Sequence, residues 1–179
     1  SKEFCISLSE KIKENFQNFN LILSPAIGGI IIGYEIGRIL NTETIFVERV
    51  NNNFQIRRGF EINRNHKILV VEDVITTGKS SLECSSLAEK CGAEVIGFAS
   101  LIDRTGGKSD INKKIVSQIK LEISTFTADN IPENLKKIKA IIFSGGNDLQ
   151  RFNKKKENLI RDKAEKKILK FCIKNKIKV

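Results

Sequence analysis

The feature that most restricts the fold is an alternation of short apolar runs with segments of helical spacing. Apolar runs that fit buried strands occupy residues 20–23, 44–50, 67–73 and 94–104. Segments that fit helices occupy residues 5–16, about 30–40, and 80–91. Parallel strands are joined by crossover connections, usually helices, which cover the faces of the sheet. The chain is therefore predicted to be an α/β protein with a mostly parallel sheet flanked by helices.

Small or polar residues mark the ends of three of these runs. They are residues 24–29, residues 72–80, and the pair Asp103 and Arg104. In an open parallel sheet, the carboxyl ends of the strands lie at one edge, and ligands bind there. We expect the three clusters to line a common site.

The stretch ILVVEDVITTGKSS at residues 68–81 holds the densest set of candidate ligand groups. Hydroxyl side chains, one glycine and successive backbone N–H groups meet where a helix begins, a combination that favours a phosphate monoester. It is not a Walker A loop, because G-x-x-x-x-G-K-[ST] is absent. The residues of this turn are Val74, Ile75, Thr76, Thr77, Gly78, Lys79 and Ser80.

Two adjacent acids, Glu72 and Asp73, precede the turn. They could hold ribose hydroxyls or a hydrated magnesium ion, since Mg²⁺ takes few protein oxygens and keeps its waters and substrate phosphates. The alternative is a strand end whose acids face water. The turn at residues 24–29 has two interpretations as well: an anion site at a helix N-terminus, or a tight turn with glycine for close packing.

The charge distribution, the cysteines and the hydropathy limit which other functions are possible. Residues 1–135 carry 16 Lys and Arg against 17 Asp and Glu, and residues 136–179 carry 15 against 4, so the last segment accounts for the net charge of +10. Nucleic-acid binding would have to rest there, but a solvated helix face or compositional bias explains the lysines better, so no nucleic-acid partner is expected.

The four cysteines are scattered and fit free thiols rather than a zinc site, and the lone His66 fits a solvated loop. Acyl-transfer chemistry of the Ser/His/Asp kind has little support. No run of about 18 apolar residues suggests a membrane span, and the N-terminus does not resemble a targeting signal. A cytoplasmic protein without a membrane partner is expected.

The segment VVEDVITTGKS at residues 70–80 resembles the phosphoribosyl-diphosphate signature of the type I phosphoribosyltransferases. Within that family, SPAIGGIIIGYEIGR, FVERVNNNFQIRRGFEI and LIDRTGG are similar to the orotate phosphoribosyltransferases. The resemblance covers roughly residues 5–130. It implies a phosphoribosyltransferase-like (Rossmann-like) fold and a step of pyrimidine biosynthesis, in which orotate displaces diphosphate from phosphoribosyl diphosphate to give orotidine 5′-monophosphate.

The resemblance also implies roles for particular residues. Glu72 and Asp73 would be catalytic and hold the ribose hydroxyls, and residues 74–80 would wrap the 5′-phosphate. Thr76 and Arg104 would contact orotate, whose carboxylate suits a guanidinium fork. Mg²⁺ is the implied cofactor, carried mainly by the substrate without a direct protein ligand. The diphosphate would meet Ala26, Ile27 and Gly28 together with the loop arginines Arg49 and Arg58.

The loop of residues 51–67 is expected to form a hairpin or a mobile segment. In the family this loop reaches over a neighbouring subunit's site, which implies a homodimer. Many members carry a lysine where this chain has Gly28, so the arginines would take its electrostatic role. Simpler alternatives are a solvated Arg57 and Arg58, and a local ion pair between Asp103 and Arg104.

The ends of the chain depart from the family. The usual hood of some sixty residues before the first helix is expected to be absent, and its loss is expected to weaken orotate binding. Residues 136–179 are expected to form a basic extension beside a transferase core at residues 1–135. This extension resembles the early part of a class I glutamine amidotransferase of the gamma-glutamyl hydrolase kind. Cys172 does not occupy the nucleophile's position, so no amidotransferase activity is predicted, and a truncated or fused reading frame is suspected.

Two other functions stay open on the sequence. One is a non-catalytic regulator that binds phosphoribosyl diphosphate, and the other is a phosphoribosyltransferase for a different base.

Overall fold

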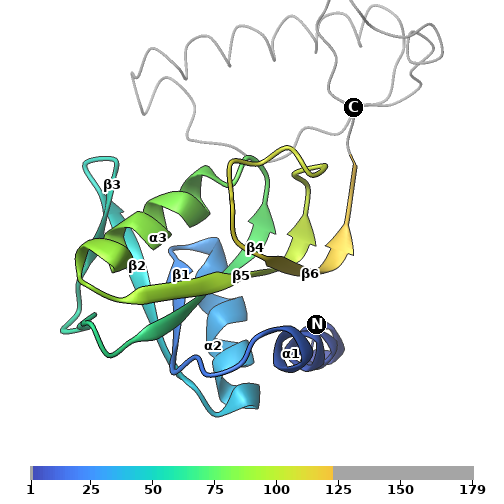
Figure 1. Ribbon diagram of the computed structural model, residues 1–179, viewed down its shortest axis with the longest axis horizontal. Helices are drawn as coiled ribbons and strands as arrows, with labels where there is room; N and C mark the ends of the chain where they lie inside the picture. Colours follow the sequence, from blue (N-terminus) through green and yellow to red (C-terminus); the bar gives the residue numbers. More distant parts are fainter. Residues whose placement is uncertain (1, 123–179) are drawn as a thin grey trace, which may run out of the picture. The chain divides into compact units, whose positions relative to one another are not determined.

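The computed structural model of the protein describes residues 2–122, which form a six-stranded sheet with the order β3-β2-β1-β4-β5-β6 (Figure 1). Every neighbouring pair is parallel except β2 and β3, which are antiparallel. The predicted fold class is confirmed. The strands are β1 (Leu21–Pro25), β2 (Glu43–Val50), β3 (Asn53–Ile56), β4 (Lys67–Ile75), β5 (Glu94–Asp103) and β6 (Ile115–Lys120).

Three helices cover the sheet: α1 (Lys2–Asn15), α2 (Gly28–Leu40) and α3 (Lys79–Lys90). Helices α1 and α2 lie on one face and α3 lies on the other (Figure 1). Successive side chains of β4 pack on opposite faces of the sheet, because side chains alternate along a strand. Leu69 and Val71 pack with α1 and α2, whereas Ile68 and Val70 pack with α3. Each such fully buried side chain contributes about 1.5–3 kcal/mol to folding.

The hairpin expected after residue 50 is present. Asn51 and Asn52 link β2 to β3 with positive φ angles of 50° and 68°, and Val50 pairs with Asn53. Two left-handed residues match the right-handed twist of a tight hairpin, and asparagine adopts that conformation readily. The hairpin is therefore a paired extension of the sheet up to Ile56.

The strand pairing brings the predicted clusters together. Strand β4 lies between β1 and β5, with Leu23 opposite Val70 and Ile75 opposite Asp103. The turns after these three strands therefore share the carboxyl edge of the sheet, as predicted.

No helix within residues 2–122 is long and apolar enough to cross a membrane. Cys5, Cys84 and Cys91 are free thiols in this part of the chain, as expected. The basic extension, its amidotransferase resemblance and Cys172 lie outside the described residues.

Candidate active site

The turn after β1 and the turn after β4 enclose a cavity of about 330 Å³ at the carboxyl edge of the sheet. Two of the three predicted clusters thus meet in one place. The cavity is lined by Pro25, Ala26, Gly28, Gly29, Glu72, Asp73, Val74, Thr76, Thr77, Gly78, Lys79 and Ser80.

The two adjacent acids have different surroundings. Glu72 is 6% exposed and accepts a 2.9 Å hydrogen bond from Ser81 Oγ on α3. Burial raises the pKa of Glu72 to about 7, and the Asp73 charge adds to the rise, while the Ser81 hydrogen bond opposes it. Asp73 is exposed and lies against Gly28 at the start of α2. Side chains alternate along β4, and this separates the two carboxylates. Glu72, the buried one, becomes neutral as the pH falls through about 7.

The start of α2 lies close to the side chain of Asp73 at Gly28. A Cβ atom added to Gly28 would lie 2.8 Å from Asp73 Cγ, closer than van der Waals contact permits. The preceding peptide bond, between Ala26 and Ile27, is cis. Of the predicted residues in this turn, Ala26 and Gly28 line the cavity, whereas the side chain of Ile27 is 85% exposed.

The turn from Val74 to Ser80 ends where α3 begins. Gly78 has a φ of +80° and precedes the first residue of α3. Thr77 Oγ1 accepts the Lys79 N–H at 3.3 Å, and the other N–H groups of the first turn of α3 remain for a ligand at the positive end of the helix dipole. Thr76 and Thr77 are exposed at the cavity, while Ile75 is buried at 1% exposure and offers only its backbone.

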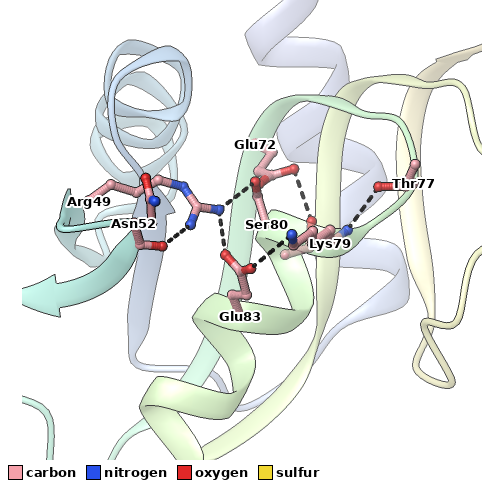
Figure 2. Close-up of polar contacts among 8 residues, drawn as sticks. Arg49, Asn52, Glu72, Thr77, Lys79, Ser80 and Glu83 are labelled. Atoms are coloured by element: carbon pink, nitrogen blue, oxygen red, sulfur yellow. Dashed lines mark hydrogen bonds and ion pairs between the residues drawn. The ribbon is translucent and has the colours of Figure 1, made fainter. Parts of the chain in front are cut away.

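Arg49, near the end of β2, reaches the same helix end. Its Nη2 donates to Ser80 Oγ at 3.3 Å and also to the carboxylate of Glu83 (Figure 2). Arg58, by contrast, lies in the segment after β3 and donates to both carboxylate oxygens of Glu48, at 3.0 and 2.9 Å. The structure brings Arg49 to the phosphate-type turn and does not bring Arg58 to the cavity.

Arg104 follows β5 beside the turn after β4. Its backbone N–H donates to the Ile75 carbonyl at 2.8 Å, which fixes its position next to Thr76, and its side chain is exposed. Within residues 2–122, no ion pair joins Arg104 to Asp103, whose Oδ1 instead accepts from the Thr105 N–H at 2.8 Å. The described residues thus show no local Asp103–Arg104 ion pair, and the role of Arg104 stays a prediction.

Two residues of this site, Ser81 and Glu83, were not predicted from the sequence. Ser81 stands nine positions after the Glu72 that it contacts, and no short motif signals such a pair. Glu83 had a partial signal, because Lys79 and Glu83 are spaced i, i+4 on a predicted helix and their charged groups lie 4.0 Å apart. Its contact with Arg49 spans 34 positions and depends on the folded sheet.

A second hollow, of about 480 Å³, borders the cavity at Gly28 and Asp73. Its walls are mainly apolar side chains of α1 and α2, and three of these are well exposed: Ile31 at 81%, Tyr34 at 64% and Phe4 at 52%. A concentration of exposed apolar side chains marks a surface suited to contact with another chain or ligand.

Comparison with known proteins agrees with this geometry. Residues 2–136 match the family described as the phosphoribosyl transferase domain. An orotate phosphoribosyltransferase from Maricaulis maris is 39% identical over 142 residues, which cover 79% of this chain and 73% of that protein. One from Methylobacterium is 42% identical over 138 residues, covering 76% and 70%.

Solved structures share the fold at lower identity. The adenine phosphoribosyltransferase from Thermoanaerobacter pseudethanolicus has a TM-score of 0.56 and 20% identity, covering 66% of this chain and 79% of that one. The orotate phosphoribosyltransferase from Mycobacterium tuberculosis, in complex with inorganic phosphate, has a TM-score of 0.52 and 20% identity, covering 65% and 68%.

Proposed function

The chain belongs to the phosphoribosyltransferase family, in its orotate phosphoribosyltransferase branch, and we propose that it transfers ribose 5-phosphate from phosphoribosyl diphosphate to orotate. The products are orotidine 5′-monophosphate and diphosphate. The observation that carries the proposal is the cavity that joins an exposed carboxylate, a glycine turn and a helix N-terminus. Those three elements match the ribose, diphosphate and 5′-phosphate of one substrate.

The 5′-phosphate binds at residues 74–80. Backbone N–H groups at the start of α3 and the hydroxyls of Thr76 and Thr77 supply several short donors to its oxygens. The ribose hydroxyls then lie over Glu72 and Asp73, and the diphosphate extends toward Ala26 and Gly28. The absence of a side chain on Gly28 leaves room beside Asp73 for the sugar and its leaving group.

The reaction exchanges one bond at the anomeric carbon for another. The bond to the diphosphate oxygen breaks, and its electron pair leaves with diphosphate. The ring nitrogen of orotate supplies the pair for the new carbon–nitrogen bond, and its proton passes to water. The anomeric carbon carries positive charge between these events, so the anionic Asp73 beside the ribose stabilises the transition state, and fixed placement of both partners lowers the barrier further.

Orotate binds between the ribose and the turn after β5. The Arg104 side chain is free of ion pairs within residues 2–122, so its guanidinium can receive the orotate carboxylate in a two-pronged hydrogen bond. Its backbone bond to Ile75 keeps it adjacent to Thr76, the second proposed orotate contact.

Magnesium fits this site as a substrate-borne ion. Among the described residues, no three His, Cys, Asp or Glu side chains gather as a metal cage. The exposed Asp73 carboxylate suits an ion that keeps most of its waters and binds phosphate oxygens. Carried by the substrate's phosphates, Mg²⁺ would supply positive charge to the departing diphosphate, while Asp73 would hold the ribose.

We propose further that residues 1–135 hold the transferase and that the protein acts as a homodimer. The family match over residues 2–136 supports the first part. The exposed apolar hollow of α1 and α2 supports the second, because a second copy would cover side chains such as Ile31. Sedimentation of the protein and of an Ile31→Glu variant tests the dimer; a monomeric wild type would contradict it.

Mixing the protein with orotate, phosphoribosyl diphosphate and Mg²⁺, and following the loss of orotate absorbance, tests the activity. We expect orotate-dependent turnover, with adenine and uracil inactive in matched assays that follow diphosphate release. Turnover with another base but not with orotate would reassign the acceptor. Failure to bind phosphoribosyl diphosphate at all would remove the whole proposal.

A further inference from the structure

The loop between β5 and β6 (Figure 1), residues 104–114, touches the phosphate-binding turn of residues 74–80 at two points. At the start of this connecting loop, the Arg104 N–H donates to the Ile75 carbonyl at 2.8 Å. Further along, the side chain of Ile111 lies against Gly78, because a Cβ atom added to Gly78 would lie 2.8 Å from Ile111 Cδ1 and 3.0 Å from its Cγ1. The connecting loop therefore clamps residues 75–78 of the turn at both ends.

The connecting loop is itself held in place. Near its start, the Thr105 carbonyl accepts a hydrogen bond from the Lys108 N–H at 3.0 Å. Near its end, Lys113 Nζ donates to the Val95 carbonyl of β5 at 2.6 Å. Between these points, Ile111 packs against the buried cluster on the α3 face of the sheet. Hydrogen bonds and a partly buried apolar contact raise the free energy of local opening, so the loop stays against the turn.

Only Thr76 and Thr77 lie between the two clamped residues, and both side chains are exposed at the cavity. Gly78 follows them with a φ of +80° and leads into α3. A glycine with open space around it adopts many backbone conformations. The Ile111 side chain restricts this freedom at Gly78, so a shift at Thr76 changes the position of the first N–H groups of α3 instead of being absorbed by rotation at the glycine.

We propose that the connecting loop makes the turn respond as one unit, so that orotate at Thr76 and the 5′-phosphate at the start of α3 each tighten the binding of the other. Ile111 is the positioning residue of this coupling. The inference rests on the proposed function, which places both ligands on the turn. The first ligand to bind orders residues 75–78, and the second then binds a turn that is already ordered. The Arg104 side chain is not required, because the backbone N–H of Arg104 supplies the clamp.

Equilibrium titration with two ligands that do not react with each other tests the coupling. Ribose 5-phosphate carries the phosphate and the sugar but no diphosphate leaving group, so it can be combined with orotate. Titration calorimetry would give the Kd of ribose 5-phosphate without orotate and with saturating orotate, and the ratio of these values is the coupling factor. We expect a factor of about five or more for the wild type, and the same factor when the ligands exchange roles, because coupling between two sites is reciprocal.

Variants of the loop should separate coupling from affinity. Ile111→Ala should bring the coupling factor close to one, with the Kd of each ligand alone within about twofold of the wild type. Ile111→Val removes Cδ1 and keeps Cγ1, so its factor should be intermediate. Arg104→Ala should do the reverse, with orotate bound about tenfold more weakly and the coupling factor retained. Ile62→Ala is the matched control, because Ile62 packs on the same buried cluster from the segment before β4, and it should keep the wild-type factor.

The outcomes separate the alternatives. A wild-type factor of one, with both ligands bound, would overturn the inference and leave the proposed function intact. A wild-type factor that persists in Ile111→Ala would assign the coupling to direct contact between the ligands, and loss of the factor in Ile62→Ala would assign it to the core as a whole; either result would overturn the role of the loop. A wild type that binds neither ligand would remove the proposed function and this inference with it.

Thermal unfolding of each variant shows whether it is folded at the temperature of the titration. If Ile111→Ala is not folded, Ile111→Val decides the test, because it removes only the one carbon atom nearest to the Cβ position of Gly78. A reduced factor in folded Ile111→Val supports the role of Ile111, and a full wild-type factor would overturn it.

Discussion

Ser81 Oγ donates a 2.9 Å hydrogen bond to Oε2 of Glu72, and both side chains are buried between β4 and α3. This contact is one reason that two adjacent acids can end a strand. The bond favours the charged form of Glu72, but burial outweighs it and raises the pKa of Glu72 to about 7. Of the two adjacent acids, Glu72 therefore carries a proton that exchanges near neutral pH.

The free energy of unfolding should depend on pH because Glu72 titrates in the folded protein near pH 7. Its pKa is about 7 in the folded protein against an ordinary value of 4.5, so the folded state binds more protons than the unfolded state between these pH values. The contribution of Glu72 to stability is thus highest below pH 4.5 and falls, by up to about 3 kcal/mol, as the pH rises to 7. Urea unfolding of the wild type and Glu72→Gln at pH 5 and 7.5 would measure the difference.

Glu72→Gln should flatten this dependence, because the amide has no proton to lose. The exposed loop change Glu61→Gln is the control and should leave the wild-type slope in place. Equal slopes for the wild type and Glu72→Gln would contradict a raised pKa at Glu72.

Removal of the Ser81 hydroxyl should shift the pH dependence of catalysis. Ser81→Ala takes away the hydrogen bond that lowers the pKa of Glu72, so that pKa should rise further. If ionised Glu72 accepts hydrogen bonds from the ribose, kcat/KM for phosphoribosyl diphosphate increases as the pH passes through about 7, and the increase should move to higher pH in the variant. Ser85→Ala is a matched control, since that buried hydroxyl donates to Glu89 instead.

Two glycines of α2 should respond differently to alanine. Gly28→Ala places a methyl group against the exposed Asp73 carboxylate, so we expect at least a tenfold loss of kcat/KM with little change in the melting temperature. Gly37→Ala places a methyl group 2.9 Å from the Thr42 carbonyl oxygen, far from the cavity. We therefore expect a loss of stability of about 1–3 kcal/mol. Calorimetric melting and steady-state kinetics on both variants would distinguish the effects; a normal kcat/KM for Gly28→Ala would show that Asp73 has room to move.

The sequence supported the parts of the fold that depend on local patterns. Apolar runs predicted four strands, and the asparagines after Val50 predicted the hairpin. Strand β6 was not predicted, because residues 115–120 form a short run that ends in the exposed Ile119 and Lys120, which gives little periodicity. It is a strand because it pairs with β5 at the edge of the sheet.

In the candidate site, too, the features that follow from a local motif were predicted, and those that depend on contacts between distant elements were not. The acids and the turn of residues 74–80 form one continuous motif, so their common location followed from strand order. Ser81 and Glu83 could not be assigned from the sequence, because their partners come from other elements. Arg49 and Arg58 looked equivalent in the sequence. In the folded protein, strand pairing places Arg49 against Glu83 of α3, whereas Arg58 donates to Glu48.

Asp73→Asn should reduce turnover by about a hundredfold or more without loss of stability. The amide keeps the size of the side chain beside Gly28 but removes the negative charge that we assign to the ribose and its transition state. Orotate consumption at saturating substrate would measure kcat. Glu43→Gln, an exposed change at the start of β2 and therefore at the opposite edge of the sheet, is the control. Near-normal kcat in Asp73→Asn would move the essential negative charge to Glu72.

Arg104→Ala should weaken orotate far more than phosphoribosyl diphosphate. The guanidinium is assigned to the orotate carboxylate, and a lost charge-assisted pair raises KM for orotate about tenfold or more, with the KM for phosphoribosyl diphosphate within about twofold. Arg104→Lys keeps the charge but lacks the two-pronged guanidinium group. Its KM for orotate should lie between those of the wild type and Arg104→Ala. Arg64→Ala, in the exposed segment before β4, controls for general loss of positive charge. A selective rise in KM for phosphoribosyl diphosphate would instead assign Arg104 to the diphosphate, because the two anions lie on opposite sides of the anomeric carbon.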